Sequence, residues 1–205
     1  MGDPRDTNRV RRAMDATPRA GFLLPEDRQW AGVDMPLSIG SGQTNSQPWT
    51  VREMLRLLGV RPGHKVLDVG SGSGWTTAIL AELVGPTGSV LGLERIPQVM
   101  EFGRANLERS ERPWTAIRLA SRGVLGAPDE APFDRILVSA EADRFPDALA
   151  DQLADGGVLV VPVAGTMTRA HRRGGELDIS THGQFRFVPL IVDQDDKEQM
   201  AQEES

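Results

Sequence analysis

VLDVGSGSGW, residues 66–75, decides the fold of this chain of 205 residues. Its first four positions are apolar except for Asp68, which is typical of a buried strand. A turn with glycine at every second position follows, and residues 76–84, TTAILAELV, have helical periodicity. The glycines are Gly70, Gly72 and Gly74. Because glycine lets the backbone approach a ligand and the helix start offers free N–H groups, the stretch predicts a nucleotide-binding α/β unit. A tight turn without a ligand is the alternative.

An acidic residue follows this unit at the distance expected of a ribose-binding carboxylate. Glu94 ends the next apolar run, SVLGLE at 89–94, about 20 residues after Gly74. A carboxylate at the end of that strand can accept hydrogen bonds from both hydroxyls of a ribose. The spacing therefore predicts a ligand that contains a ribose.

The turn favours S-adenosyl-L-methionine over a dinucleotide or a nucleoside triphosphate. Gly74 comes only two residues after Gly72, so the third glycine of Gly-x-Gly-x-x-Gly is missing, and no Gly-Lys-Ser/Thr follows. Asp68 suits a ligand with an ammonium group and would repel a diphosphate. S-adenosyl-L-methionine carries an ammonium, a sulfonium and a ribose. The alternative for Asp68 is a carboxylate that only caps the turn.

Composition excludes several classes of protein. The net charge of −6 and the lack of long basic runs argue against a nucleic-acid-binding surface. The chain has no cysteine, which excludes disulfides, thiolate nucleophiles and cysteine-ligated metals, and we expect no metal site. No apolar stretch approaches the roughly 18 residues of a membrane span, and the charged N-terminus is unlike a secretory signal. We therefore expect a cytoplasmic protein that does not bind membranes; the oligomeric state stays open.

The length of 205 residues predicts one domain with a full-sized core over residues 1–205. Residues 1–60 are expected to hold N-terminal helices and a polar functional loop, and residues 61–192 the α/β core. Residues 193–205 are acidic and expected to be disordered, as are residues 1–7.

Strands and helices alternate along the core, which predicts an α/β fold with a mostly parallel sheet and helices on both faces. Strands are predicted at 66–69, 89–94, 115–120, 134–140 and 156–164. Helices are predicted at 9–19, 50–60, 76–84, 97–109 and 146–153, with a turn or helix at 21–31. Residues 175–181 and 184–192 alternate in period two and predict an antiparallel C-terminal hairpin that turns at His182-Gly183. The polar loop 33–49 is long enough to be functional.

Five separated segments resemble the protein-L-isoaspartate O-methyltransferase family. PLSIGSGQTNSQPWTV, 36–51, resembles that family's loop Pro-Leu-x-Ile-Gly-x-Gly-Gln-Thr-Ile-Ser-Gln-Pro, and LDVGSGSGW resembles its cofactor motif. FDRILVSA, LADQLADGGVLVVPV and FRFVPL resemble its later strands, so the resemblance covers roughly residues 20–192. It implies a Rossmann-like class I S-adenosylmethionine-dependent methyltransferase. The implied activity is methylation of the α-carboxylate of L-isoaspartyl residues in proteins or peptides, followed by spontaneous succinimide closure.

The resemblance also implies the site residues. Ser46 would position the substrate, with Thr44 and Gln47 beside it; the alternative is that Ser46 only caps the following helix, where Thr50 and Glu53 form a competing capping box. No catalytic base is required, because a carboxylate with a pKa near 4 is ionised at pH 7. The predicted cofactor-binding residues are Asp68, Gly70, Ser71, Gly72, Gly74, Glu94, Arg95, Ser121 and Arg122.

The chain departs from the family pattern at three places. Asn45 replaces the isoleucine of the substrate loop, and Arg122 stands where Gly-Asp-Gly supplies an acceptor for the adenine amino group. Glu141 falls in the segment that is usually Ala-Ala-Ala-Pro, where a carboxylate would oppose an anionic substrate. These changes leave three hypotheses: an isoaspartyl methyltransferase, a methyltransferase for another carboxylate such as aspartate in a dedicated partner, and a non-catalytic homologue that binds a ligand or a partner.

Overall fold

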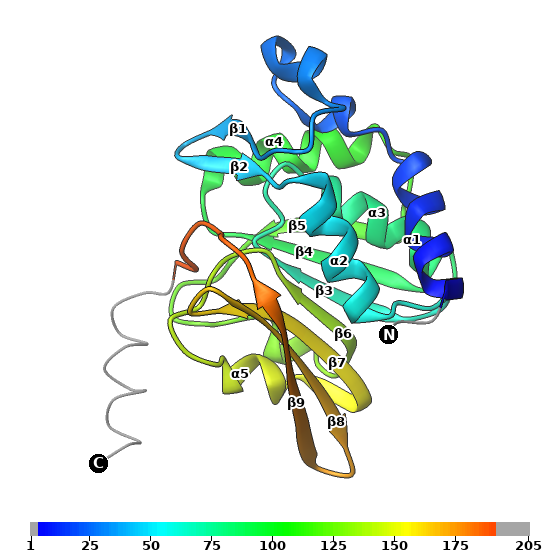
Figure 1. Cartoon of the computed structure of the whole chain (residues 1–205), viewed down its shortest axis with the longest axis vertical. Helices are drawn as coiled ribbons and strands as arrows, with labels where there is room; N and C mark the ends of the chain where they lie inside the picture. Colours follow the sequence, from blue (N-terminus) through cyan, green and yellow to red (C-terminus); the bar gives the residue numbers. More distant parts are fainter. Residues whose placement is uncertain (1–3, 192–205) are drawn as a thin grey trace.

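A seven-stranded sheet in the order β5-β4-β3-β6-β7-β8-β9 forms the centre of the protein (Figure 1). The computed structural model describes residues 4–191. The strands are β3 (Lys65–Val69), β4 (Ser89–Glu94), β5 (Thr115–Leu119), β6 (Phe133–Val138), β7 (Leu153–Val163), β8 (Thr166–Arg173) and β9 (Glu176–Gln184). Strands β3 to β7 pair in parallel, while β8 and β9 are antiparallel to their neighbours. The sheet is therefore mostly parallel with an antiparallel C-terminal part, as the sequence predicts.

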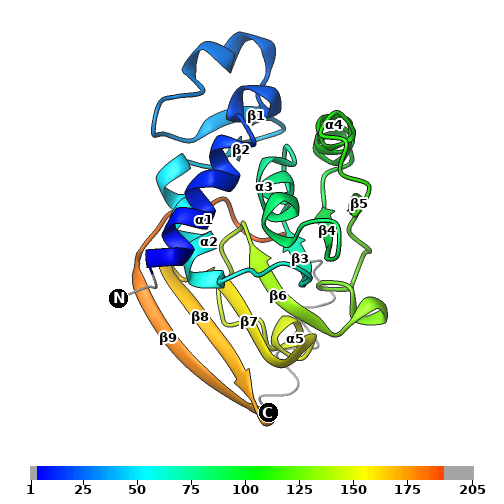
Figure 2. The same cartoon turned by 90° about the vertical axis from the view of Figure 1, so that its right-hand side faces the viewer.

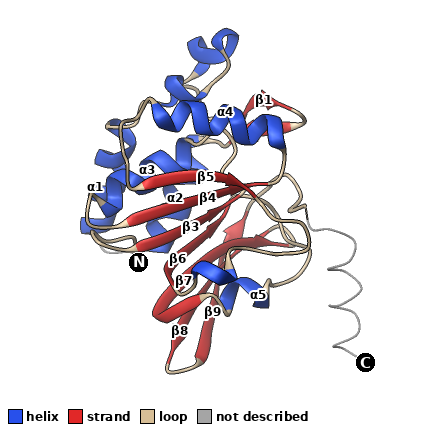
Figure 3. Ribbon diagram, turned by 180° about the vertical axis from the view of Figure 1, so that it is seen from behind, coloured by secondary structure: helices blue, strands red, loops and turns tan. Residues whose placement is uncertain are grey.

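Helices cover the two faces of this sheet unequally (Figures 2 and 3). The helices are α1 (Pro4–Asp15), α2 (Pro48–Leu58), α3 (Trp75–Val84), α4 (Pro97–Glu108) and α5 (Asp147–Ala150). Buried side chains of α1, α2 and α3 form one core with alternate residues of the strands, such as Val66 and Val90. The intervening residues, such as Leu67 and Leu91, form a second core with α5 and nearby loops. Strand side chains alternate between faces, so the inner parallel strands β3, β4, β6 and β7 are buried on both sides, whereas the edge strand β5 buries only Ile117.

The parallel register brings three strand ends to one edge of the sheet. Val69 pairs with Leu93 of β4 and with Val138 of β6, so the segments after these residues leave the sheet together. The chain order reverses at β3, because its neighbours β4 and β6 lie on opposite sides of it. Ligands of open α/β sheets bind in the crevice at such a reversal.

The N-terminal part places a small hairpin beside this edge. It contains β1 (Leu37–Gly40) and β2 (Gln43–Asn45), which pair antiparallel within the predicted functional loop. Short 3-10 helices lie at Arg19–Phe22, Pro25–Trp30 and Pro128–Glu130.

The predicted C-terminal hairpin is wrong in its position. The turn lies at Gly174-Gly175, both with positive φ, and joins β8 to β9. The sequence TMTRAHRR of β8 carries four charged or titratable side chains, so its apolar pattern is weak, although Met167 and Ala170 are fully buried. Residues 185–191 form no strand, and only Pro189 makes an isolated bridge, to Glu141.

Other boundaries also differ from the prediction. Helix α2 begins at Pro48 instead of residue 50, because proline fits the first helical position. Helix α5 covers only Asp147–Ala150, since β7 begins at Leu153. Residues 4–7 were expected to be disordered but belong to α1, whereas the predicted disordered tail 193–205 lies outside the described residues. No helix in the described part of the chain is long and apolar enough to cross a membrane.

Candidate active site

The glycine turn after β3 is held in place by backbone contacts with β4. The amides of Gly70 and Ser71 donate to Leu93 O over 2.8 and 3.0 Å. All three glycines of the turn have positive φ, between 54° and 84°. A Cβ on Gly74 would also lie 2.8 Å from Gly103 O on α4. The turn therefore requires glycine for its conformation and for its approach to α4.

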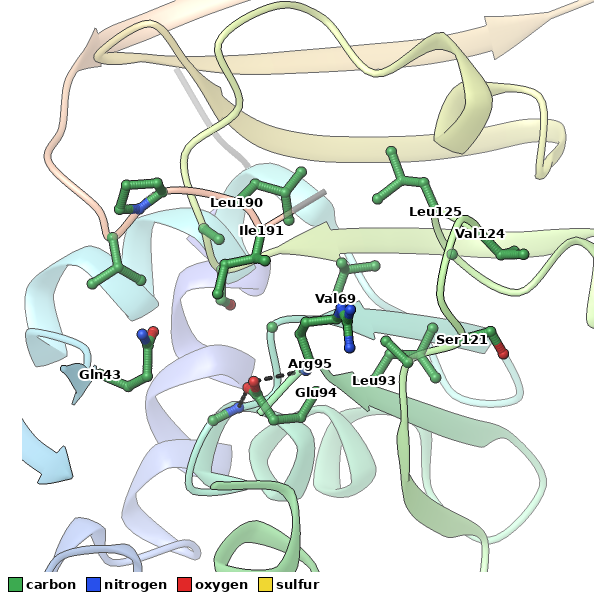
Figure 4. Close-up of a pocket in the computed structure, with 18 of the residues that line it drawn as sticks. Gln43, Val69, Leu93, Glu94, Arg95, Ser121, Val124, Leu125, Leu190 and Ile191 are labelled. Carbon is green, nitrogen blue, oxygen red and sulfur yellow. Dashed lines mark hydrogen bonds between the residues drawn. The ribbon is translucent and has the colours of Figure 1, made fainter. Parts of the chain in front are cut away.

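Glu94 joins the glycine turn to the end of β4 (Figure 4). Its Oε2 accepts the Gly72 amide at 3.0 Å, and its Oε1 accepts the amides of Arg95 and Ile96 at 2.8 and 3.0 Å. A carboxylate has about four lone-pair sites, so three amides leave acceptor capacity for about one more donor. The contact with both ribose hydroxyls stays a prediction, in which the hydroxyls would share the Glu94 carboxylate with these three amides.

A cavity opens between the glycine turn, the ends of β3, β4 and β6, and the C-terminal segment, residues 185–191 (Figure 4). Its polar lining includes Gly70, Gly72, Glu94, Arg95 and Ser121. Its apolar lining includes Val69, Leu93, Val124, Leu125, Leu190 and Ile191. This lining fits S-adenosyl-L-methionine, because it combines a carboxylate for the ribose, an open backbone at the turn and apolar side chains for a purine.

Two predicted cofactor-binding side chains lie beneath the turn and do not line the cavity. Asp68 is fully buried, and its Oδ2 accepts the Thr77 hydroxyl at 2.7 Å. Its Oδ1 and the Ser71 hydroxyl have no hydrogen-bond partner among the described residues. Burial raises the pKa of Asp68 to about 7, opposed by the Thr77 hydrogen bond and reinforced by the charge of Glu94. A direct contact between Asp68 and an ammonium group therefore stays a prediction that needs the turn to open.

Of the two neighbouring residues predicted near the adenine, one lines the cavity and the other does not. Ser121 lines the cavity together with Gly123, whereas Arg122 is exposed and does not. Gly74, also predicted at the site, stays outside the lining and instead packs against α4. The structure thus separates residues that face a ligand from residues that shape the turn.

A second cavity lies next to the first and contains the predicted substrate residues. Thr44, Ser46 and Gln47 line it. It shares three lining residues with the first cavity: Thr44, Ser139 and Val188. A molecule in the second cavity therefore lies beside one in the first.

Ser46 does not cap α2. The N-cap is Gln47, and no side-chain cap hydrogen bond is present. No group among the described residues bonds to the Ser46 hydroxyl, so it is available to a ligand. The capping box is also wrong: Thr50 donates to Gln47 Oε1 at 3.4 Å, and Glu53 pairs with Arg56 at 2.9 Å.

Comparison with known proteins assigns this arrangement to a family. The family described as protein-L-isoaspartate(D-aspartate) O-methyltransferase matches residues 4–195. The chain belongs to this family. It is 45% identical to the protein-L-isoaspartate O-methyltransferase of Methanopyrus kandleri over 190 residues, which are 90% of this chain and 84% of the relative. It is 46% identical to that of Methanothrix thermoacetophila over 191 residues, covering 90% and 89%.

Solved structures confirm the predicted fold and cofactor. A Plasmodium falciparum structure, described as a protein-L-isoaspartate O-methyltransferase in complex with S-adenosyl-L-homocysteine, superposes with a TM-score of 0.79 at 25% identity and covers 91% of each chain. The protein therefore has the class I, Rossmann-like methyltransferase fold and uses S-adenosyl-L-methionine. Its activity is that of a protein-L-isoaspartate O-methyltransferase, acting on isoaspartyl protein substrates.

Two departures from the family pattern, Asn45 and Glu141, do not line either cavity. Asn45 is 4% exposed, and its side chain bonds to Arg19 and Ser73 under the substrate loop. The side chain of Glu141 lines neither cavity, while its backbone holds the C-terminal segment: its amide donates to Val188 O at 2.8 Å and its carbonyl accepts the Leu190 amide at 2.7 Å.

The sequence did not indicate the role of Arg19, whose side chain holds the substrate loop in place. Arg19 lies 26 positions before Asn45 in the chain. Its guanidinium donates to the carbonyls of Val33, Met35, Asn45 and Ser46 at 2.8 to 3.1 Å, as well as to the Asn45 side chain. It also lies 5.5 Å from the centre of the Trp75 ring. Burial lowers the pKa of Arg19 to about 10, against a smaller opposing effect of Asp34, so it is charged at pH 7. No pattern of spacing marks a single arginine for this role.

Proposed function

We propose that this protein methylates the α-carboxylate of L-isoaspartyl residues, with the cofactor in the first cavity and the isoaspartyl residue in the second. The observation that carries this proposal is the hydroxyl of Ser46, which bonds to no other described residue and lies in a cavity that adjoins the cofactor cavity. Cytoplasmic localisation stays a prediction.

The chain's own residues need only bind and orient. When bound, S-adenosyl-L-methionine supplies a methyl group on a positively charged sulfur. An ionised carboxylate oxygen accepts that methyl group directly: one O–C bond forms, one S–C bond breaks with its electrons left on sulfur, and no proton moves. The Ser46 hydroxyl donates a hydrogen bond to the carboxylate and holds an oxygen in line with the methyl group, where reacting atoms about 3–3.5 Å apart favour transfer.

The other predicted substrate residues support Ser46 in different ways. Thr44 lines both cavities, so it lies at the boundary where the methyl group crosses. The Gln47 side chain donates to Asp34 at 3.1 Å and accepts from Thr50 at 3.4 Å. Because both ends of its amide are engaged, we assign Gln47 to the positioning of the loop instead of a direct contact with the carboxylate.

The alternative of another carboxylate substrate rested on Asn45 and Glu141, and neither side chain lines a cavity. The isoaspartyl residue is therefore the better supported substrate.

The test is transfer of a radiolabelled methyl group to an isoaspartyl peptide and to its aspartyl twin of identical sequence. We expect label only in the isoaspartyl peptide, as a base-labile ester. Label in the aspartyl twin at an equal or higher rate would contradict the proposed substrate, and no label in either peptide would contradict the activity.

A further inference from the structure

The second cavity contains one positively charged group that the proposed reaction does not use. Of the described residues that line this cavity, only Arg186 is charged. Its side chain is exposed, and no carboxylate of the described residues forms an ion pair with it. The cavity that holds Ser46 therefore presents a free cation to a ligand.

The position of Arg186 is fixed by its two neighbours. Phe185 and Phe187 are half-buried and pack against the main core, and the Phe185 ring stacks on Trp49 of α2 with centroids 5.4 Å apart. The Phe185 amide donates to Gly165 O at 2.8 Å. Phe187 and Val188 line the second cavity together with Arg186. The anchored phenylalanines thus keep Arg186 at the cavity.

The charge balance of methyl transfer argues against a cation on the reacting group. An anionic carboxylate and a cationic sulfonium become a neutral ester and a neutral thioether, so charge is lost as the transition state forms. A cation paired with the attacking carboxylate would stabilise the reactants more than the transition state and slow the step. The neutral hydroxyl of Ser46 suits that carboxylate, whereas Arg186 suits a carboxylate that does not react.

An isoaspartyl residue cannot supply this second carboxylate itself. Its side-chain carboxyl is part of the peptide bond, and its one free carboxylate is the methyl acceptor. The second anion must come from another residue of the same peptide. Such an acidic peptide would otherwise be repelled by a protein of net charge −6.

We infer that Arg186 is a specificity-determining residue, which favours isoaspartyl sites with an aspartate or glutamate close by in the peptide. This inference rests on the proposed function. The ion pair forms in both the ground state and the transition state, so it acts on capture of the substrate and not on the methyl-transfer step.

The experiment compares kcat/KM for isoaspartyl peptides that differ only by Glu, Gln or Lys within two positions on either side of the isoaspartyl residue. For the unmodified protein at low salt we expect Glu to exceed Gln by about two- to fivefold on at least one side, which is the range of exposed ion pairs. Lys should fall below Gln, and the differences should shrink as salt is added.

Two variants assign the preference to one side chain. Arg186→Gln should remove the ratio between the Glu and Gln peptides, and Arg186→Glu should reverse it in favour of Lys. Arg118→Gln, on the edge strand β5 and outside both cavities, removes the same charge and should keep the ratio. Affinity for S-adenosyl-L-homocysteine, measured by calorimetry, shows that each variant is folded.

Equal kcat/KM for the Glu and Gln peptides, or a preference that survives in Arg186→Gln, would overturn the assignment while leaving the proposed function intact. Failure to methylate any isoaspartyl peptide would instead remove the proposed function and this inference with it.

Discussion

Arg19 and Asn45 form the buried contact that ties the substrate loop to the N-terminal region. Arg19 Nε donates to Asn45 Oδ1 at 2.7 Å, and the two residues are only 5% and 4% exposed. The Asn45 amide continues this contact by donating to the Ser73 hydroxyl at 2.9 Å, inside the glycine turn. The substrate loop and the cofactor turn are therefore joined through polar groups that water does not reach.

Asn45→Ile, which introduces the usual residue of the family, should destabilise this protein. It leaves Arg19 Nε and the Ser73 hydroxyl without these partners, and an unpaired buried polar group costs about 1–3 kcal/mol. We expect the free energy of unfolding in urea to fall by about that amount. Asn45→Asp is the matched control, because aspartate still accepts from Arg19. Equal stability of the isoleucine variant would mean that the loop carbonyls alone satisfy Arg19.

Glu94→Ala should weaken binding of S-adenosyl-L-homocysteine at least tenfold. The change removes the predicted ribose acceptor and also the acceptor of three backbone amides, at Gly72, Arg95 and Ile96. Charge-assisted hydrogen bonds of this kind contribute about 1.5–3 kcal/mol each. Calorimetric titration measures the loss, and circular dichroism tests folding.

Glu94→Gln separates the two roles of this side chain. The amide oxygen can still accept from Arg95 and Ile96, but the amide nitrogen cannot accept from Gly72. We expect an affinity between those of the wild type and Glu94→Ala. Wild-type affinity in the alanine variant would remove Glu94 from the cofactor site.

Ser46→Ala should lower turnover at least tenfold and leave the melting temperature within about 1 °C, because the hydroxyl caps no helix and has no partner among the described residues. Initial rates with an isoaspartyl peptide and a thermal melt of the same sample measure both effects. Loss of a helix cap would instead lower stability by about 1 kcal/mol. A lower melting temperature with unchanged turnover per folded molecule would therefore contradict the assignment.

The sequence was sufficient for the central part of the fold because local and long-range signals agree there. The strand, turn and helix around Gly72 are each specified by neighbouring residues, and Glu94 lies at a fixed distance along the chain. The C-terminal hairpin was misplaced because the arginine-rich β8 is stabilised by pairing with β7 and β9, which no local pattern shows. A Gly-Gly pair at 174–175 was the available signal for the turn.

Some residues of the candidate site could be predicted from the sequence and others could not. Residues whose roles depend on backbone geometry, such as Gly70 and Gly72, could be predicted, as could Ser46 through its family motif. The direction of a side chain could not: Asp68 and Arg122 were predicted at the cofactor, yet neither lines the cavity. Arg19 escaped prediction because its acceptors are carbonyl groups, which every residue carries.

Asp68 should make stability depend on pH. Burial raises its pKa to about 7 in the folded protein from the usual 3.8. Between these values the unfolded chain loses the proton while the folded protein keeps it, so the free energy of unfolding falls as pH rises from about 4 to 7. Above that range the folded form also ionises and the contribution levels off.

Asp68→Asn removes this titration and should flatten the profile. Denaturant unfolding at pH 4.5 and 7.5 gives the difference in the free energy of unfolding between the two proteins at each pH. We expect this difference to change by on the order of a few kcal/mol between the two pH values. Because other carboxylates titrate in both proteins, only the difference is diagnostic. Parallel profiles would show that Asp68 is ionised in the folded protein throughout.

At Arg122 the chain lacks the family's acceptor for the adenine amino group. Its side chain is exposed and outside the cavity, while Ser121 lines it, so the amino group must find its acceptor at Ser121 or a nearby carbonyl. Arg122→Asp supplies a carboxylate and should tighten binding of S-adenosyl-L-methionine by about tenfold, since pairing a buried donor is worth about 1–3 kcal/mol. Arg122→Ala, which removes the arginine without adding an acceptor, should change the affinity by less than twofold. Titration of both variants with S-adenosyl-L-methionine and S-adenosyl-L-homocysteine decides between two arrangements. Weaker binding in both variants would mean that the planar guanidinium turns inward and stacks on the purine when the cofactor binds.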